Sequence, residues 1–446
     1  MPKVFIKTYG CRMNERDSEQ VASQFLERGY QLTEDESEAD VILLNTCSVR
    51  DQAEQKALGN MGRLRSFKRQ RPRLILGFLG CMAQSHGKEL FDRLPDVDLV
   101  VGTQHFHRVA DYVEEAQSPD GCRKRIVNIE EEKRSENAIR DHVLHPKQPT
   151  ALVSAMQGCD LHCAFCIVPS VRGAERSRPI AEIVAEIRFL AGRGVKEVTL
   201  LGQAVNFYGR HELPVSDGKT PFVQLLEAVH AVKGIERIRF ASPYPSAFRD
   251  DLINAIAELP KVCEHIHLPL QAASNRVLKA MRRLYTVEKY RQVVQRLRER
   301  IPTVAISTDF IVGFPGETEA EFQETVAFAR EIQFDQAFVF RFSPRKGTPA
   351  ATMEGQHPKE EKKRRNQELL AVVNESVKRK LEADVGTVQE ILVESASKTN
   401  PSRMTGRTRQ NRIVVFSGDG SHQGRLLRVH IERALGFSLL GKLSIA

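Results

Sequence analysis

The sequence predicts an α/β protein with an N-terminal doubly wound parallel α/β domain, a central open (β/α)6 partial barrel and a small C-terminal β-barrel. Short apolar runs alternate with helical patterns through most of the chain, which is typical of parallel sheets. Short alternating strands with turn signals then follow, which is typical of a small barrel. We place the three domains at residues 1–115, 149–380 and 381–446. The charged stretch 116–148, bounded by prolines, is predicted to be a linker.

The composition indicates a non-membrane protein with real cores. The chain has 446 residues, 41% of them hydrophobic, and no apolar run approaches the ~20 residues of a membrane span. No export signal opens the sequence, so we expect a cytoplasmic monomer, in a compartment where cysteines rarely form disulfides. The formal charge of +9 favours a polyanionic partner without identifying one.

Three predicted strands of the N-terminal domain, at 4–10, 41–46 and 73–80, each end beside a cysteine. These cysteines are Cys11, Cys47 and Cys81. Parallel strands end at one edge of their sheet, so we expect the three thiols to converge there as ligands of a metal or cluster. The alternative is that each is a small buried apolar residue, which is the commoner role of a single cysteine after a strand.

Strands and helices alternate again in the central domain, as in the helical stretches 180–194 and 250–259. The predicted strands are 151–157, 197–203, 237–243, 265–271, 304–314 and 336–344. Active-site groups of such barrels lie at the carboxyl ends of the strands. The polar and glycine residues found there are Gly202, Gln203, Asn206, Ser242, Pro243, Gln271, Gly313 and Arg345.

The last domain is predicted to be a small barrel, with strands at 388–395, 412–418 and 424–443. The basic helix before it, 359–380, is expected to present a solvated face. Residues 395–412 contain no acid and form a turn-rich segment with five basic residues. These residues are Lys398, Arg403, Arg407, Arg409 and Arg412. They suggest an RNA-binding surface on an OB-like barrel, the alternative being a merely solvated loop.

The stretch GCDLHCAFCIVP, residues 158–169, places Cys159, Cys163 and Cys166 on one loop after a predicted strand. A structural zinc site needs four ligands, whereas three thiolates on a [4Fe–4S] cluster leave one iron open to an outside molecule. His162 is the alternative fourth ligand. Cys122 and Cys263 have no partner at ligand spacing and are predicted to be ordinary thiols.

This cysteine spacing, with Phe165 just before the third cysteine, resembles the radical S-adenosylmethionine (SAM) superfamily. The resemblance implies that the open iron binds SAM and that electron transfer cleaves SAM to a 5′-deoxyadenosyl radical. Phe165 is therefore a candidate SAM-pocket residue. The other candidates are Gly202, Gln203, Asn206, Ser242, Gln271, Gly313 and Arg345.

Several further motifs resemble the methylthiotransferase family along the whole chain. They are KTYGCRMNERDSE, NTCSVRDQAEQKALG, GCMAQ, HLPLQAASNRVLKAMRRLYT and STDFIVGFPGET. The C-terminal part is similar to a TRAM domain. The resemblance implies a second [4Fe–4S] cluster on Cys11, Cys47 and Cys81. It also implies two SAM molecules per reaction, an electron donor and a sulfur source.

The stretches NTCSVRDQAEQKA and SRMTGRTRQNRIVVF look most like the MiaB-type subgroup, which methylthiolates carbon-2 of N6-isopentenyladenosine beside the tRNA anticodon. That C–H bond is unactivated, so a radical replaces side-chain acid–base chemistry, and we assign no catalytic side chain. Alternative substrates are threonylcarbamoyl-adenosine in tRNA and ribosomal protein S12; the basic barrel favours RNA. A non-catalytic, zinc-containing RNA-binding protein is the alternative outside this enzyme class.

Overall fold

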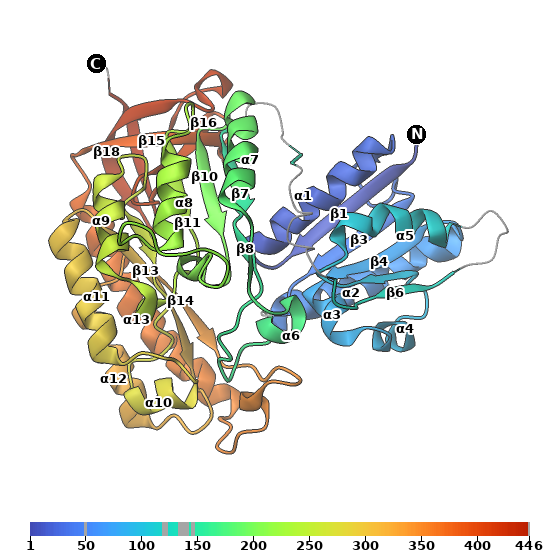
Figure 1. Ribbon diagram of the computed structural model, residues 1–446, viewed down its shortest axis with the longest axis horizontal. Coiled ribbons are helices and arrows are strands. Elements are labelled where there is room, and N and C mark those ends of the chain that lie inside the picture. The colour runs from blue at the N-terminus through green and yellow to red at the C-terminus, as the bar shows by residue number, and fades with distance from the viewer. Residues whose placement is uncertain (49–50, 118–123, 133–141, 144–147, 445–446) are drawn as a thin grey trace. The chain divides into compact units, whose positions relative to one another are not determined.

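The computed structural model describes residues 1–48, 51–117, 124–132, 142–143 and 148–444 (Figure 1). The chain forms two compact units. The first contains residues 1–144, 156–162 and 166–178, and the second contains 145–155, 163–165 and 179–446. Cys122 lies outside the described residues. None of the described helices is both long enough and apolar enough to cross a bilayer.

The first unit is built on a six-stranded parallel sheet, in the order β2-β1-β3-β4-β5-β6. Its strands are β1 (Lys3–Tyr9), β2 (Gln31–Leu32), β3 (Val41–Thr46), β4 (Ile75–Gly80), β5 (Leu99–Val101) and β6 (Ile126–Asn128). Figure 1 shows the sheet between its helices. The helices are α1 (Arg12–Glu27), α2 (Asp51–Gln70), α3 (Cys81–His86), α4 (Glu89–Arg93) and α5 (Val109–Ala116).

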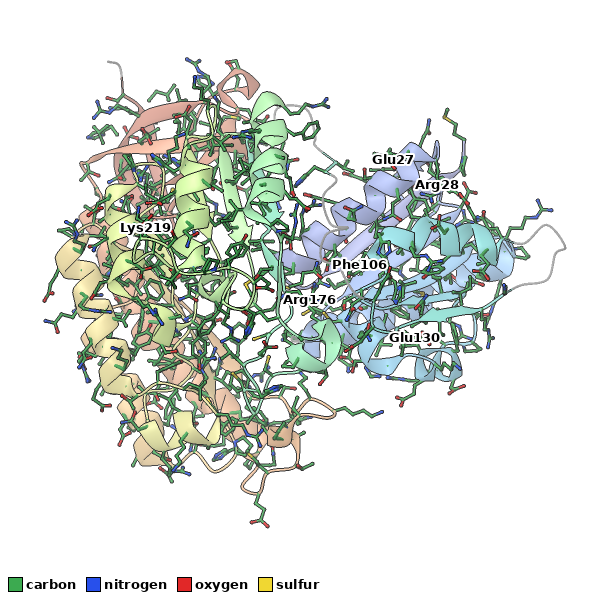
Figure 2. All side chains as sticks on the ribbon, in the orientation of Figure 1. Glu27, Arg28, Phe106, Glu130, Arg176 and Lys219 are labelled. Atoms are coloured by element: carbon green, nitrogen blue, oxygen red, sulfur yellow. The ribbon has the colours of Figure 1, made fainter. Side chains whose placement is uncertain are left out.

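Both faces of this sheet are covered, as a doubly wound domain requires. Val21 and Phe25 of α1 share one core with α5, and Phe106 lies within that core (Figure 2). Met61 of α2 and Leu90 of α4 belong to the core of the opposite face. The predicted doubly wound fold is thus confirmed, although β2, β5 and β6 were not predicted. Strand β6 lies in the stretch 116–148 that was predicted to be a linker.

The second unit contains the predicted partial barrel, whose six parallel strands form two three-stranded sheets. They are β7 (Thr150–Ser154), β10 (Glu197–Leu201), β11 (Arg237–Phe240), β12 (His265–His267), β13 (Ala305–Val312) and β14 (Gln336–Arg341). A bridge between Ile238 of β11 and Val262 joins the first sheet to the segment just before β12. The covering helices are α7 (Ile180–Gly192), α8 (Pro221–His230), α9 (Asp250–Glu258), α10 (Asn275–Ala280), α11 (Val287–Arg300) and α12 (Glu319–Ile332).

The C-terminal part of this unit is a closed five-stranded barrel in the order β15-β16-β17-β19-β18. Its strands are β15 (Val388–Ala396), β16 (Arg403–Thr408), β17 (Ile413–Ser417), β18 (Leu426–Leu435) and β19 (Ser438–Leu443). The small barrel is confirmed, but the prediction of a turn-rich segment was wrong at 403–408. Those residues form β16, because Met404, Gly406 and Thr408 alternate into the core while the residues between them face outward.

Helix α13 (Lys359–Ala383), predicted to be a solvated basic helix, is anchored along β14. Arg365 forms a buried ion pair with Glu317, with Nη1 2.8 Å from the carboxylate. Below the small barrel, Arg237 and Arg239 of β11 donate hydrogen bonds to main-chain carbonyls of the barrel. Arg237 reaches the carbonyl of Arg407 at 2.7 Å, and Arg239 reaches that of Thr408 at 2.8 Å.

Candidate functional site

The first unit brings Cys11, Cys47 and Cys81 to one edge of its sheet. Cys11 caps the N-terminus of α1 after β1, Cys47 follows β3, and Cys81 begins α3 after β4. A hydrogen bond with Cys47 lowers the pKa of Cys11 to about 6, and the positive charge of Arg172 contributes. Burial raises the pKa of Cys81. The thiols therefore meet at the carboxyl ends of three adjacent strands.

Two glycines allow the chain to pass closely beside these cysteines. Gly10 has a φ of +147°, and a Cβ there would lie 2.4 Å from Cβ of Cys47. Gly80 has a φ of +89°, and its Cβ would lie 2.3 Å from Oδ1 of Asn45. Both turns thus require a residue without a side chain.

Two buried asparagines, which the sequence analysis did not single out, orient this edge. The thiol of Cys11 donates to Oδ1 of Asn14 at 3.2 Å, and Nδ2 of Asn14 donates to Oδ1 of Asn45 at 3.0 Å. Asn45 in turn donates to Oγ of Ser18 at 2.9 Å. The nearness of each asparagine to a candidate ligand was the available signal. Such outer partners fix ligand orientation in metal sites.

A buried ion pair lies beside the same thiols. Arg172 belongs to the short helix α6 (Val168–Arg172), and its Nη2 lies 2.6 Å from Oδ2 of Asp17. Both side chains are almost fully buried, at 3% and 1% exposed. The positive charge of Arg172 also acts on Cys81, where it opposes the effect of burial on the pKa, and Nη1 of Arg172 is buried without a hydrogen-bond partner among the described residues. Sequence reasoning missed this pair, for which no spacing signal exists.

The spacing of these three sulfurs fits a group larger than one zinc ion. Zinc–sulfur bonds of ~2.3 Å hold bound sulfurs no more than ~4.6 Å apart. Among the described residues, no set containing Cys11, Cys47 and Cys81 has all its ligand atoms within 4.8 Å. An all-thiolate donor set with wider spacing suits a multi-iron cluster.

The second cysteine loop follows β8 (Met156–Gln157). Gly158 has a φ of +77°, and a Cβ there would lie 1.9 Å from the carbonyl oxygen of Ala174. The amide of Cys159 donates to the carbonyl of Gly173 at 3.2 Å. Cys159 and Cys166 belong to the first unit, where His162 is exposed.

Cys163 and Phe165 belong to the second unit. The sulfur of Cys163 accepts a hydrogen bond from Nη1 of Arg283 at 3.5 Å. Ala164 is held at both backbone groups, since its amide donates to Met281 at 2.9 Å and its carbonyl accepts from Ala350 at 2.8 Å. Phe165 packs against the core around Phe314. Arg283 is therefore an additional contact that the sequence analysis did not predict.

The structure places the candidate SAM-pocket residues beyond the carboxyl ends of the barrel strands. Ser242 and Gln271 have positive φ values of 57° and 76°, and such strain in residues other than glycine is common at functional sites. The buried Oε1 of Gln203 has no hydrogen-bond partner among the described residues. Gly202 follows β10, and Arg345 lies in the loop after β14.

Two of the candidates have structural contacts. Asn206 brackets the backbone of Tyr244, donating to its carbonyl at 2.9 Å and accepting from its amide at 2.7 Å. Gly313 has a φ of +67°, and its amide donates to Glu317 at 2.7 Å. Their SAM contacts stay predictions.

Cys263, as predicted, is a buried ordinary thiol, and burial raises its pKa.

Side chains on the inner face of β12–β14 form an aromatic and polar lining. His267 lies 3.0 Å from Oγ of Ser307 and 3.3 Å from Oδ2 of Asp309. Its ring meets that of Phe338 edge to face, with centroids 6.1 Å apart. Phe338 and Phe340 stack with centroids 6.5 Å apart and are 43% and 37% exposed. Phe310, by contrast, points to the opposite face and packs on Phe334.

The five predicted RNA-binding residues do not form one patch of unpaired cations. Lys398 is exposed and Arg403 is half-buried. Arg407 pairs with Glu394 at 3.2 Å, whereas Arg409 clamps Glu264 of the partial barrel, with Nη2 to Oε1 at 2.7 Å. Arg412 pairs with Asp384 and with Asp335, the latter at 3.3 Å. Arg409 and Arg412 thus attach the small barrel to the domain beneath it.

Other cations of the small barrel are more accessible. Arg425, Arg428 and Arg433, around and on β18, are all exposed, and Phe437 in the turn before β19 is 69% exposed. They are spread over residues 425–433 among apolar residues, so they do not stand out as a basic cluster in the sequence. Exposed cations and an exposed aromatic side chain on one barrel suit a nucleic-acid surface.

Comparison with known proteins gives three family matches in chain order. Residues 3–102 match an uncharacterized protein family, UPF0004; residues 153–329 match the radical SAM superfamily; and residues 382–444 match the TRAM domain. A radical S-adenosylmethionine methyltransferase, TsrM of Kitasatospora setae, has a similar fold. Its TM-score is 0.56 at 12% identity, covering 79% of this chain and 75% of that one.

Curated relatives match the chain over nearly all of its length. A tRNA-2-methylthio-N(6)-dimethylallyladenosine synthase of Akkermansia muciniphila is 54% identical over 99% of this chain and 98% of the relative. The synthase of that name from Opitutus terrae is 49% identical over 100% and 98%. The synthase of Methylacidiphilum infernorum is 49% identical over 99% and 94%. The chain therefore belongs to the tRNA-2-methylthio-N(6)-dimethylallyladenosine synthase family of the radical SAM superfamily.

Proposed function

We propose that this protein is a radical SAM tRNA methylthiotransferase that adds a methylthio group to carbon-2 of N6-isopentenyladenosine beside the anticodon. The observation that carries the proposal is 54% identity to a synthase of this name over 99% of the chain. The substrates are tRNA and SAM, and the reaction needs an electron donor and a sulfur source. The proposed setting is the cytoplasm and the proposed state is a monomer.

Two cysteine triads are proposed to hold one [4Fe–4S] cluster each. Cys11, Cys47 and Cys81 form the first triad, at the edge of the doubly wound sheet. The loop of Cys159, Cys163 and Cys166 forms the second. When bound, the clusters and SAM supply the radical chemistry that an unactivated C–H bond requires. The protein contributes ligands, orientation and burial, with Asn14 and Asn45 fixing the first edge.

The side chains that would receive SAM follow the barrel strands. Phe165, Gly202, Gln203, Asn206, Ser242, Gln271, Gly313 and Arg345 remain the proposed SAM-pocket set. Gln203 is the best supported polar member, because its buried Oε1 has no hydrogen-bond partner within the described part of the chain and suits a ligand donor.

The inner face of the barrel favours isopentenyladenosine over threonylcarbamoyl-adenosine. Phe338 and Phe340 offer exposed aromatic surface to an adenine extruded from its stack and to its apolar isopentenyl tail. A threonylcarbamoyl tail carries a carboxylate, and Asp309 beside His267 adds negative charge to this face. Like charges repel, so this lining supports the apolar substituent.

The product of the reaction tests the proposed function. The anaerobically reconstituted protein, given reductant, a sulfide source and SAM, should convert isopentenyladenosine in tRNA to its 2-methylthio derivative, measured by mass spectrometry of the nucleosides. tRNA carrying threonylcarbamoyl-adenosine is the control and should remain unmodified. Modification of the control tRNA alone would reassign the substrate.

The two triads are tested by iron content. The protein should bind about eight irons, four per cluster. Replacing Cys159, Cys163 and Cys166 by Ala should halve the iron and abolish 5′-deoxyadenosine formation. Replacing Cys11, Cys47 and Cys81 should also halve the iron and stop methylthiolation, yet preserve 5′-deoxyadenosine formation. Unchanged iron in either variant would remove that triad from the ligand set.

A further inference from the structure

One nitrogen of the buried Arg172 guanidinium, Nη1, has no hydrogen-bond partner among the described residues. Nη2 donates to Oδ2 of Asp17 at 2.6 Å, and the positive charge of the guanidinium acts on the thiol of Cys81. Nη1 is buried and has no hydrogen-bond acceptor in the described part of the chain. Burial of a cationic donor without an acceptor is energetically unfavourable, so we expect an anionic group to bind this nitrogen.

The surrounding groups indicate which partner that is. The charge of Arg172 acts on the thiols of Cys11 and Cys81, and Cys11 in turn hydrogen-bonds Cys47. The guanidinium that carries the unpartnered donor therefore lies near Cys11 and Cys81, two of the three proposed ligands of the first cluster. A cluster on three thiolates carries sulfide and thiolate sulfurs, which accept hydrogen bonds from N–H groups. Hydrogen bonds and positive charge at those sulfurs raise the reduction potential of a cluster.

Arg172 is held in place by its own segment. The hydroxyl of Thr103 donates to the carbonyl of Val171 at 2.5 Å, and Ile167 and Val171 pack against Cys81. Helix α6, which carries Arg172, begins just after Cys166 in the sequence. The segment that leaves the second cysteine loop thus supplies a positive charge to the first triad.

We propose that Arg172 is a positioning residue of the first cluster, whose Nη1 donates a hydrogen bond to a cluster sulfur and raises the cluster's reduction potential. The proposal rests on the proposed function, which assigns this cluster to Cys11, Cys47 and Cys81. Asp17 acts in the opposite sense, since its carboxylate orients Arg172 but offsets part of its charge. The two residues should therefore shift the potential in opposite directions.

The test isolates the first cluster by replacing Cys159, Cys163 and Cys166 with Ala and reconstituting four irons. The midpoint potential is measured by a redox titration followed by electron paramagnetic resonance. Arg172→Gln should shift the one-electron equilibrium about tenfold toward the oxidised cluster, which is ~59 mV lower. Asp17→Asn should raise the potential. Arg71→Gln is the matched control; Arg71 donates to the carbonyl of Ala39 at 3.0 Å, before the amino end of β4, and its loss should leave the potential unchanged.

The signs of these shifts distinguish charge from structure. If Arg172 only holds α6 in place, both Arg172→Gln and Asp17→Asn break the same ion pair and shift the potential in one direction, which overturns the proposal. An unchanged potential in Arg172→Gln with four irons also overturns it. Should Arg172→Gln lose iron, a lowered potential in Asp17→Asn overturns it and a raised one supports it. Absence of iron in the parent background instead contradicts the ligand assignment, and with it the proposed function.

Discussion

Phe338 and Phe340 lie on the inner face of a barrel strand and yet are 43% and 37% exposed. Exposure of an apolar ring to water is unfavourable, and a planar base that stacks on the ring removes this exposure. Their neighbour His267 holds its ring by two hydrogen bonds, to Ser307 and Asp309. A rigid aromatic platform of this kind suits recognition of a flat, apolar substrate group.

Phe338→Ala is expected to weaken use of isopentenyladenosine tRNA. Stacking of a base on an aromatic ring contributes ~1–3 kcal/mol, so kcat/KM should fall about tenfold or more. The measurement is methylthiolation rate against tRNA concentration, with 5′-deoxyadenosine formation followed in parallel. Phe189→Ala, which removes a ring that is 56% exposed on α7, is the control. Equal rates in the two variants contradict the platform.

Glu321 shows how a single carboxylate connects two helices of the second unit, α10 and α12. It accepts from Nε of Arg276 at 2.5 Å and from the amide of Thr318 at 2.8 Å, completing a capping box at the start of α12. The hydrogen bond from Arg276 lowers the pKa of Glu321 to about 2. The charged form is thus favoured in the folded protein.

Glu321→Gln should lower the free energy of unfolding at pH 7 by ~1–2 kcal/mol. Because the folded pKa is depressed, this contribution is present above pH ~4.5 and is lost as pH falls toward 2. Urea unfolding at several pH values measures the gap between the wild type and the variant. Glu331→Gln breaks the exposed pair with Arg291 and should cost less than ~1 kcal/mol. If the difference in free energy of unfolding between the wild type and Glu321→Gln grows as pH falls, the charged carboxylate of Glu321 is not its cause.

At the scale of elements, the turn into the second cysteine loop depends on Gly158. Its φ of +77° is the same as that of Gly29, but the space around the two residues differs. A Cβ at Gly158 would meet the carbonyl of Ala174 at 1.9 Å, whereas nothing lies within 4 Å of one at Gly29. Comparing alanine substitutions at Gly158 and Gly29 therefore separates the effect of steric conflict from that of backbone strain.

Gly158→Ala should displace the loop and lose the iron of the second cluster, while Gly29→Ala should retain it. Each variant pays the strain of a left-handed alanine, about 1 kcal/mol or more, but only the first also has the clash. Iron content and 5′-deoxyadenosine formation are the readouts. Full iron in Gly158→Ala would show that the loop tolerates the displacement.

The elements that the sequence predicted are those with their own apolar pattern, such as β3 and β4, which are buried throughout. The short strands β2, β5 and β6 have two or three residues, and neighbouring strands rather than local pattern determine them. Strand β16 was missed because Gly406 and its arginines mask a period-2 core face. Local signals cannot reveal strands that exist only through their neighbours.

The residues of the candidate site also divide into those that a local sequence signal predicted and those that only distant contacts define. Strand ends predicted that Cys11, Cys47 and Cys81 lie at one edge of the sheet, and cysteine spacing placed Cys159, Cys163 and Cys166 on one loop, because each signal lies within a short stretch; their role as ligands stays a prediction. The contact between Asp17 and Arg172 joins residues 155 positions apart, and Phe338 meets His267 only through strand pairing. The ion pairs of Arg409 and Arg412 also depend on distant acids, so the sequence could not separate docking cations from free ones.

At the scale of the whole molecule, the small barrel contains two classes of cation. Arg409 is occupied by Glu264, whereas Arg428 is exposed on β18. Only a cation that can reach phosphate releases counterions from tRNA on binding. The two classes should therefore differ in the salt dependence of tRNA affinity.

Arg428→Met should weaken tRNA binding and lower the slope of log affinity against log salt by about one. Arg409→Met should leave that slope unchanged and instead lower the thermal stability of the second unit, because Glu264 loses its partner. Lys398→Met, at another exposed position, should behave like Arg428→Met. Affinity measured at three salt concentrations decides between these outcomes; equal slopes in all variants would exclude the barrel from phosphate binding.

Arg237 and Arg239 hold the small barrel mainly through the carbonyls of Arg407, Thr408 and Arg409, and Arg237 adds one side-chain contact, to Glu390 of β15. Every residue has a main-chain carbonyl, so these hydrogen bonds do not depend on which side chains β16 carries. The outer surface of the barrel can therefore change in sequence without altering these main-chain contacts. An engineered chimaera with a foreign barrel should likewise join correctly, provided that its β16 keeps the same backbone path and that the barrel keeps the partners of Arg237, Glu264 and Asp335.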